Sequence, residues 1–129
     1  MARILVVDDE QGIRDGIRRA LTPLGHEVIL ADDGPEATRV IREIGADLAL
    51  VDIHMPKMDG LELLITFQAA APAMPVIVMS GGGRSRQLDM LPDARLLGAI
   101  GTLAKPFSLE ELHKAVTLAL AAGPREDTG

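Results

Sequence analysis

Short apolar runs alternate with longer segments of helical period along the chain. The runs are ILVV at 4–7, VILA at 28–31, LALV at 48–51, VIVM at 76–79 and TLA at 102–104. Most of them are aliphatic or β-branched and lack polar alternation, which is typical of parallel strands covered on both faces. The pattern therefore predicts an α/β fold of five β–α units, in which a parallel sheet carries helices on both faces.

The segments between the runs have the spacing of amphipathic helices. Their apolar positions are Ile13, Ile17, Leu21 and Leu24; Ala37, Val40, Ile41 and Ile44, which are expected to face inward; Leu61, Leu64 and Ile65; and Leu112, Val116 and Leu120. Gly25 and Gly45 are expected to end the first two helices, and a capping box from Ser108 to Glu111 to begin the last one. Between the fourth and fifth runs, three consecutive glycines and Pro92 predict a loop followed by a broken helix.

Composition limits the classes of protein and partner. A chain of 129 residues fits one domain, and we assign residues 1–122 to it and residues 123–129 to a polar tail. A net charge of −6 argues against binding to nucleic acid or to a membrane surface. The absence of cysteine excludes disulfides and thiolate chemistry. Because no apolar stretch has the length of a signal peptide core or a membrane span, we expect a cytoplasmic protein.

Polar side chains follow most of the runs directly. They are Asp8, Asp9 and Glu10 after the first run, Asp52 after the third, Ser80 after the fourth and Lys105 after the fifth. Each alone has an ordinary interpretation, because aspartates after a strand often cap the next helix and an aspartate before a proline often belongs to a turn. Together they place carboxylates, a hydroxyl and an ammonium at the carboxyl edge of one sheet, where doubly wound folds have their sites.

Carboxylates held close together repel one another unless a cation lies among them. Mg²⁺, with Mn²⁺ as a substitute, fits such a site, because it binds a few carboxylates and keeps other positions for water and a phosphoryl group. Asp52 can then act as a nucleophile, since carboxylates form acyl phosphates. Lys105 and the Ser80 hydroxyl would position the phosphoryl oxygens and neutralise their charge.

The order VVDDE, VDIHMPKMDG, VIVMSGG and LAKPF resembles the receiver domain of bacterial two-component response regulators. The resemblance extends from residue 3 to about residue 121. It implies a flavodoxin-like (βα)₅ fold with strand order 2-1-3-4-5. The family accepts a phosphoryl group from a sensor histidine kinase or a histidine phosphotransfer protein, and catalyses its own phosphotransfer and dephosphorylation rather than the turnover of a substrate.

The resemblance also implies a role for each matching residue. Asp52 matches the phosphoacceptor, Asp9 a direct Mg²⁺ ligand, Asp8 a ligand acting through water, the His54 main-chain carbonyl a further metal ligand, and Ser80 and Lys105 the groups that contact the phosphoryl oxygens. The Lys105–Pro106 peptide bond is expected to be cis. The His54 side chain either tunes hydrolysis of the acyl phosphate or is simply exposed, and the sequence leaves both interpretations open.

One position departs from the family pattern. Family members usually carry Tyr or Phe three residues before the lysine, where the ring rotates inward as a switch, but this chain has Thr102. An aromatic switch at this residue is therefore impossible, and output must be coupled differently.

We expect a receiver that acts by binding a downstream protein or by onward phosphotransfer, as a monomer or a weak homodimer. The alternatives are a Mg²⁺-dependent phosphatase that forms an aspartyl phosphate, the isolated receiver of a larger DNA-binding regulator, and a binding module that works without phosphorylation. The phosphatase alternative fits less well, because the phosphatases of this kind carry their nucleophile after the first strand.

Overall fold

The computed structural model describes residues 2–53, 60–81 and 99–122 of the chain. Within them the elements alternate along the sequence as expected. They are β1 (Arg3–Val7), α1 (Gln11–Leu21), the 3₁₀ turn η1 (Thr22–Leu24), β2 (Glu27–Ala31), α2 (Gly34–Glu43), β3 (Leu48–Asp52), α3 (Gly60–Ala70), β4 (Val76–Gly81), β5 (Ala99–Lys105) and α6 (Leu109–Ala121). Every one of the five predicted apolar runs lies inside a strand.

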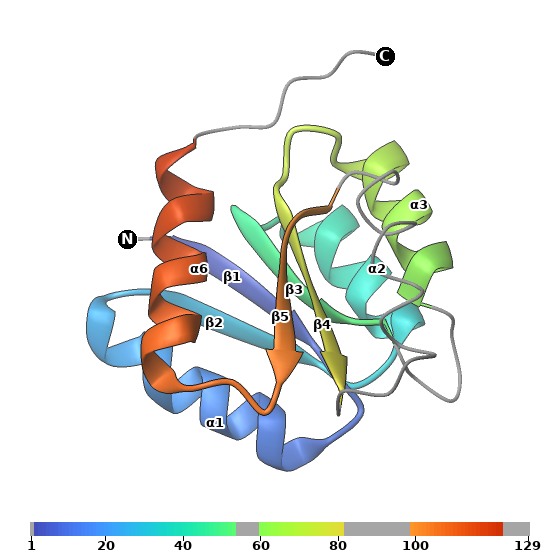
Figure 1. Ribbon diagram of the computed structural model, residues 1–129. Helices are drawn as coiled ribbons and strands as arrows, with labels where there is room; N and C mark the ends of the chain where they lie inside the picture. Colours follow the sequence, from blue (N-terminus) through green and yellow to red (C-terminus); the bar gives the residue numbers. More distant parts are fainter. Residues whose placement is uncertain (1, 54–59, 82–98, 123–129) are drawn as a thin grey trace.

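The described strands form one parallel sheet in the order β2-β1-β3-β4-β5. β1 and β3 lie at its centre, and their first paired residues are Ile4 and Leu48. The polar edge of the sheet is its carboxyl edge, where the arrowheads of Figure 1 end. The predicted fold class and strand order are therefore confirmed.

Helices cover both faces of the sheet, α1 and α6 on one and α2 and α3 on the other (Figure 1). Each face has its own core of buried side chains, and successive residues of a strand contribute alternately to the two. Val6, Leu50 and Leu103 belong to the core under α1 and α6, whereas Val7 and Val51 belong to the core under α2 and α3. This alternation follows from the period of two residues in a strand, and it determines on which face each site residue lies.

The predicted helix ends agree with the observed caps, except at Gly25. The Asp33 side chain accepts a hydrogen bond from the Glu36 backbone N–H at the start of α2. Ser108 and Glu111 form the expected capping box of α6, with both bonds at 3.0 Å. Gly45 follows the C-cap of α2 with φ of 83°, in the left-handed region that favours glycine. Gly25, with φ of 90°, caps the 3₁₀ turn η1 and does not end α1, which stops at Leu21, so the prediction for Gly25 is wrong.

Three apolar positions of the predicted helices are exposed, and one of them is Ile65 of α3, at 53%. Ile44, expected to face inward, is 45% exposed, because α2 ends at Glu43 and Ile44 serves only as its C-cap. Leu24 is 51% exposed, because α1 stops at Leu21 and the chain tightens into a 3₁₀ turn that carries Pro23. A 3₁₀ turn advances 120° per residue instead of 100°, so it rotates Leu24 away from the stripe.

All five strands extend beyond their apolar runs, and β4 and β5 extend the furthest. β4 continues through Ser80 to Gly81, and β5 begins at Ala99 rather than at Thr102. The ladder between these strands has an irregularity at Val76 and Ile77, which lets the less apolar start of β5 pair with β4. The predicted broken helix falls on residues outside the described part of the chain.

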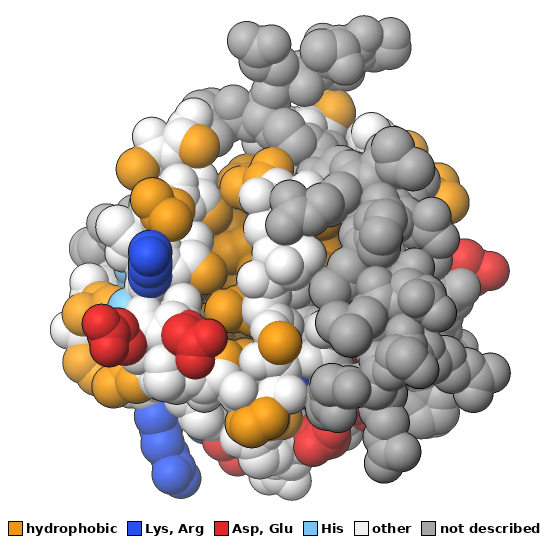
Figure 2. All heavy atoms as spheres, in the orientation of Figure 1, with side chains coloured by type: hydrophobic (Ala, Val, Ile, Leu, Met, Phe, Trp, Pro, Cys, Tyr) orange, Lys and Arg blue, Asp and Glu red, His pale blue; other side chains and the backbone are white. Residues whose placement is uncertain are grey.

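Apolar side chains also lie on the surface of α6 and β5, on the side of the molecule that Figure 2 shows. The large exposed apolar residues of these two elements are Ile100, Leu109 and Leu118. Among the described helices, none combines the length and the apolar character needed to cross a membrane.

Candidate functional site

Three of the predicted site residues lie together at the carboxyl edge of the sheet. Asp8 follows β1, Asp52 ends β3 and Lys105 ends β5. Each stands two residues after a side chain of the core under α1 and α6, so strand alternation places all three on that face. Two buried carboxylates and one ammonium from different strands therefore converge.

The Lys105 ammonium bridges the two carboxylates. Its Nζ lies 2.6 Å from Asp8 Oδ2 and 3.2 Å from Asp52 Oδ2. Asp8 is fully buried, Asp52 is 3% exposed, and the Lys105 side chain keeps only 10% exposure. Buried carboxylates need such compensation, because the loss of hydration is expensive for an unpaired charge.

The bridge also changes the acid–base behaviour of Lys105. Burial by itself lowers the pKa of this ammonium. The hydrogen bond from Lys105 to Asp8 and the negative charges of Asp52 and Asp8 act in the opposite direction and outweigh burial, so the net pKa lies above its usual range. The Lys105 side chain is therefore a cation at neutral pH.

Both the carboxylate and the main-chain carbonyl of Asp8 accept hydrogen bonds. Its Oδ1 accepts a hydrogen bond from the Glu10 backbone N–H at 2.9 Å, while its main-chain carbonyl accepts one from Arg14 Nη1 at 2.6 Å. The N-cap of α1 is Glu10, and this residue makes no side-chain capping bond. Asp8 therefore shapes the turn before α1 without capping the helix, and its second oxygen faces Lys105.

The acidic residues after β1 form a group that fits a hard cation. Carboxylate oxygens of Asp8, Asp9 and Glu10 all lie within 4.8 Å of one another, with Asp8 buried and the other two exposed. Mg²⁺ binds one or two carboxylates in an octahedral arrangement and keeps several positions for water, which the exposed Asp9 and Glu10 leave open toward solvent. Glu10 was not among the predicted ligands, although its place in the run DDE is the signal that could have included it.

Ser80 and Thr102 lie on the other face of the same strands. Ser80 is 3% exposed and stands one residue beyond Met79, the register partner of Asp52. Thr102 pairs with Val78 on the neighbouring strand, and Ser80 pairs with Ala104. By alternation from Val78, Ser80 and Thr102 are diagonal neighbours on the α2–α3 face. Thr102 thus lies next to the Ser80 hydroxyl, at the position where members of the family that the sequence resembles usually carry an aromatic ring.

The remaining predicted positions have mixed outcomes. The Lys105–Pro106 peptide bond is cis, as expected. His54, with its predicted metal-binding carbonyl, lies outside the described residues. Arg14 was not predicted, because it contacts the site through the main-chain carbonyl of Asp8, and a motif of acidic side chains does not indicate such a contact.

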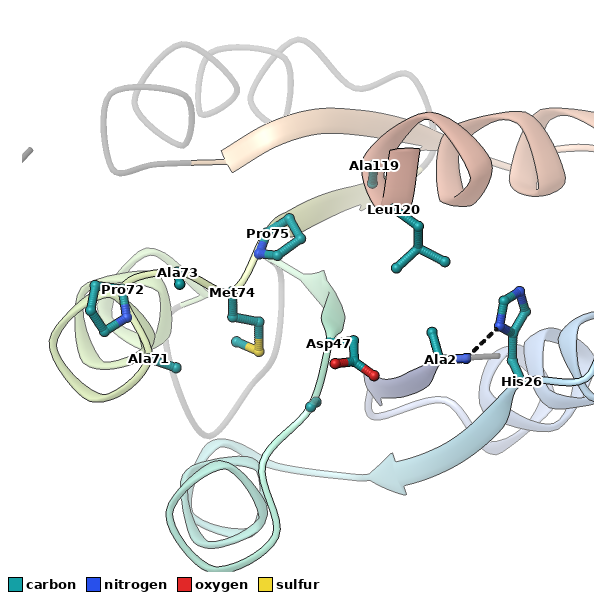
Figure 3. A pocket seen from close by; sticks show the side chains of 11 residues that line it. Ala2, His26, Asp47, Ala71, Pro72, Ala73, Met74, Pro75, Ala119 and Leu120 are labelled. Atoms are coloured by element: carbon teal, nitrogen blue, oxygen red, sulfur yellow. Dashed lines mark hydrogen bonds between the residues drawn. The ribbon is translucent and has the colours of Figure 1, made fainter. Parts of the chain in front are cut away.

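A separate pocket of about 630 Å³ lies at the opposite, amino edge of the sheet (Figure 3). Its lining includes Ala2, His26, Asp47 and Pro75, each of which directly precedes a strand. His26 Nδ1 accepts a hydrogen bond from the Ala2 backbone N–H at 3.2 Å. Burial is the main reason why the His26 pKa lies below its usual value. The pocket carries no part of the acidic site.

Comparison with known families and proteins agrees with this geometry. The family model "Response regulator receiver domain" matches residues 4–117. Sporulation initiation phosphotransferase F of Bacillus subtilis (strain 168) is 34% identical over 114 residues, which cover 88% of this chain and 90% of the relative. Response regulator MprA of Mycobacterium sp. (strain KMS) is 38% identical over 110 residues, which cover 85% of this chain and 46% of MprA. The chain thus spans about half the length of MprA.

Solved structures show the same fold. The receiver domain of NtrX from Brucella abortus superposes with a TM-score of 0.87 at 34% identity, covering 93% of this chain and 99% of that one. A response regulator receiver domain protein from Clostridium thermocellum gives a TM-score of 0.86 at 33% identity, covering 95% of this chain and 96% of that one. Both matches extend over the elements that carry the acidic edge.

Proposed function

This chain belongs to the response regulator receiver family of two-component systems, and on that basis we propose that it accepts a phosphoryl group on Asp52. One observation carries the proposal. The buried carboxylates of Asp52 and Asp8 share the Lys105 ammonium, and the exposed carboxylates of Asp9 and Glu10 lie beside Asp8. This arrangement holds a nucleophile, a fixed positive charge and a set of metal ligands within one polar edge.

The transfer follows from the chemistry of these groups. A carboxylate oxygen of Asp52 attacks the phosphorus of a phosphohistidine, the P–N bond breaks, and the imidazole leaves with its electron pair and takes up a proton. Lys105 then stays close to the new phosphoryl group and neutralises part of its charge, and Ser80 offers a hydroxyl donor. Hydrolysis by water later releases inorganic phosphate and restores the carboxylate, so the domain catalyses its own phosphorylation and dephosphorylation.

Mg²⁺, or Mn²⁺ in its place, is the proposed cofactor. Asp9 and Asp52 are the proposed direct ligands, with Asp8 acting through water, and the exposed Glu10 carboxylate lies close enough to contribute. The His54 carbonyl joins this set from the family motif alone. When bound, the ion supplies positive charge to the phosphoryl oxygens in the transition state.

The proposed donor is a sensor histidine kinase or a histidine phosphotransfer protein, in the cytoplasm. Output would pass to a downstream protein or to a second phosphotransfer, with no contact to nucleic acid or membrane by residues 1–122, the proposed receiver domain.

Switching in this chain would differ from that of receivers with an aromatic ring on β5. Thr102 is small and half-buried, and it is the diagonal neighbour of Ser80. We propose that movement of the Ser80 hydroxyl toward the phosphoryl group is transmitted through backbone shifts of β4 and β5, because Thr102 cannot fill or empty a cavity as a ring does.

Incubation with acetyl phosphate and Mg²⁺, followed by intact-mass measurement, tests the proposal. Wild-type protein should gain one phosphoryl group, and Asp52→Asn should gain none. Asp32→Asn is the matched control, because it removes the same charge from an exposed aspartate after β2 and should keep the adduct. An adduct that persists in D52N would refute the assignment, and steady turnover of a general phosphate ester would favour the phosphatase instead.

A further inference from the structure

The Arg14 guanidinium, which belongs to α1, donates a hydrogen bond to the backbone of the acidic edge. Arg14 lies in the first turn of α1, where its backbone N–H donates to the Glu10 carbonyl at 3.1 Å. From there its side chain reaches back, and Nη1 donates to the Asp8 main-chain carbonyl at 2.6 Å. The bond is short because the donor is charged.

The position of that carbonyl in the sheet makes the bond important. Val7 is the last residue of β1 that pairs with both neighbours, Ala31 on β2 and Val51 on β3. Asp8 keeps one ladder bond, from its N–H to the Ala31 carbonyl at 3.2 Å. The Asp8 carbonyl lies beyond the paired residues, so it accepts a hydrogen bond from the Arg14 side chain instead of from a neighbouring strand. The residue that presents a buried carboxylate to Lys105 is therefore fixed by helix α1.

We infer that Arg14 is a positioning residue, which holds Asp8 in the orientation that metal binding requires. The inference rests on the proposed function, since it concerns the Mg²⁺ ligands of that same site. The Arg14 bond is to the main-chain carbonyl of Asp8 and not to its carboxylate. Arg14 acts through the Asp8 backbone, and so sets where the Asp8 carboxylate lies relative to Asp9 and Glu10.

Arg14 has two opposing effects on a bound cation, and they can be separated. Its positive charge repels Mg²⁺, so its removal would strengthen binding if charge were the only effect. Its hydrogen bond keeps the ligands in place, so its removal would weaken binding. The hydrogen bond is short and directed at a fully buried residue, whereas the charge is partly exposed and screened by solvent. Positioning therefore outweighs repulsion.

Calorimetric titration of the full, unphosphorylated chain with MgCl₂ tests this directly. For Arg14→Gln we expect the Kd of Mg²⁺ to rise about fivefold, in keeping with the loss of part of one charge-assisted hydrogen bond. Arg14→Lys keeps the positive charge and can still donate a hydrogen bond, but it lacks the planar guanidinium group, so the Kd of Mg²⁺ should rise about twofold. The Mg²⁺ concentration for half-maximal phosphorylation by acetyl phosphate should rise in parallel, while the rate at saturating Mg²⁺ stays near that of wild type.

Arg18→Gln is the matched control. Arg18 lies one turn further along α1, and its ion pair is with Asp15 at 3.7 Å. It removes the same charge without touching Asp8, so its Kd should equal that of wild type. A merely structural role for Arg14 would lower the melting temperature in EDTA and leave Kd unchanged.

A wild-type Kd in either Arg14 variant, or tighter binding in R14Q, overturns the inference. If R14Q does not fold, R14K decides alone. If wild-type protein binds no Mg²⁺ and forms no adduct, it is the proposed function that fails, so the two outcomes remain distinct.

Discussion

Replacing Lys105 with methionine removes the charge that two buried carboxylates share, while it keeps a side chain of similar length. The Nζ–oxygen distances are 2.6 Å to Asp8 and 3.2 Å to Asp52. At an effective dielectric constant near 20, the Coulomb energy is roughly 6 kcal/mol for the pair with Asp8 and roughly 5 kcal/mol for the pair with Asp52, and the cost of dehydration offsets most of it. Removal of one partner of a buried pair costs about 3–5 kcal/mol. Because Lys105 keeps some contact with solvent, we expect Lys105→Met to lower the free energy of unfolding by about 3 kcal/mol.

Urea denaturation followed by far-ultraviolet circular dichroism measures this change, since the chain has neither Trp nor Tyr for fluorescence. The denaturation is measured in EDTA at pH 7, so that no bound Mg²⁺ contributes to the free energy of unfolding. Lys114→Met on the exposed side of α6 is the matched control and should change stability by less than about 0.5 kcal/mol. Saturating Mg²⁺ should stabilise K105M more than wild type, because the ion no longer competes with the ammonium for Asp8.

The pH dependence follows from the raised pKa of Lys105. A group whose pKa is higher in the folded state binds its proton more tightly there, so its contribution is complete below the unfolded pKa of 10.5. It is lost as the pH rises through the higher folded value. The stability difference between wild type and K105M should thus persist at pH 9 and shrink only above about pH 10.5. Equal stability of the two proteins at pH 7 would refute the account of Lys105 as the compensating charge.

Two further predictions concern other regions. His26 has a lowered pKa, so its contribution to stability is complete above 6.5 and is lost as the pH falls through the folded pKa; His26→Gln should flatten the decrease in melting temperature between pH 7.5 and pH 5, and an unchanged slope would contradict this. Thr102→Tyr places a ring beside Ser80, so amide chemical shifts that respond to phosphorylation should extend further along β5 than in wild type. Identical shift maps would show that position 102 plays no part in the response.

The fold was predictable because strands that are buried on both faces of the sheet appear in the sequence as continuous apolar runs. Each central strand is a continuous apolar run, and glycines or caps end the helices between them, so element type and order followed directly from the sequence. The strand order came from the family resemblance, since periodicity contains no information on which strands are neighbours. Ile44 and Leu24 were placed wrongly, because their exposure depends on where each helix stops, and here the helix ends one residue before Ile44 and three residues before Leu24.

The candidate site was predictable to the extent that it consists of side chains at strand ends. Asp8, Asp52 and Lys105 meet as expected, because parallel strands deliver their carboxyl ends to one edge. Arg14 was not predictable by this reasoning, since its contact depends on the angle at which α1 leaves β1. The division of the site between two faces also required the register of β4 and β5, which the irregularity at Val76 shifts.

The placement of the site residues by strand alternation has a consequence for how the protein can change during evolution. Asp52, Lys105 and Asp8 lie on the layer that contains α1 and α6, whereas Ser80 and Thr102 lie on the layer of α2 and α3. Substitutions that repack one layer leave the other anchored through the sheet. The geometry of Asp52, Lys105 and Asp8 can therefore stay the same while the packing around Ser80 and Thr102 changes.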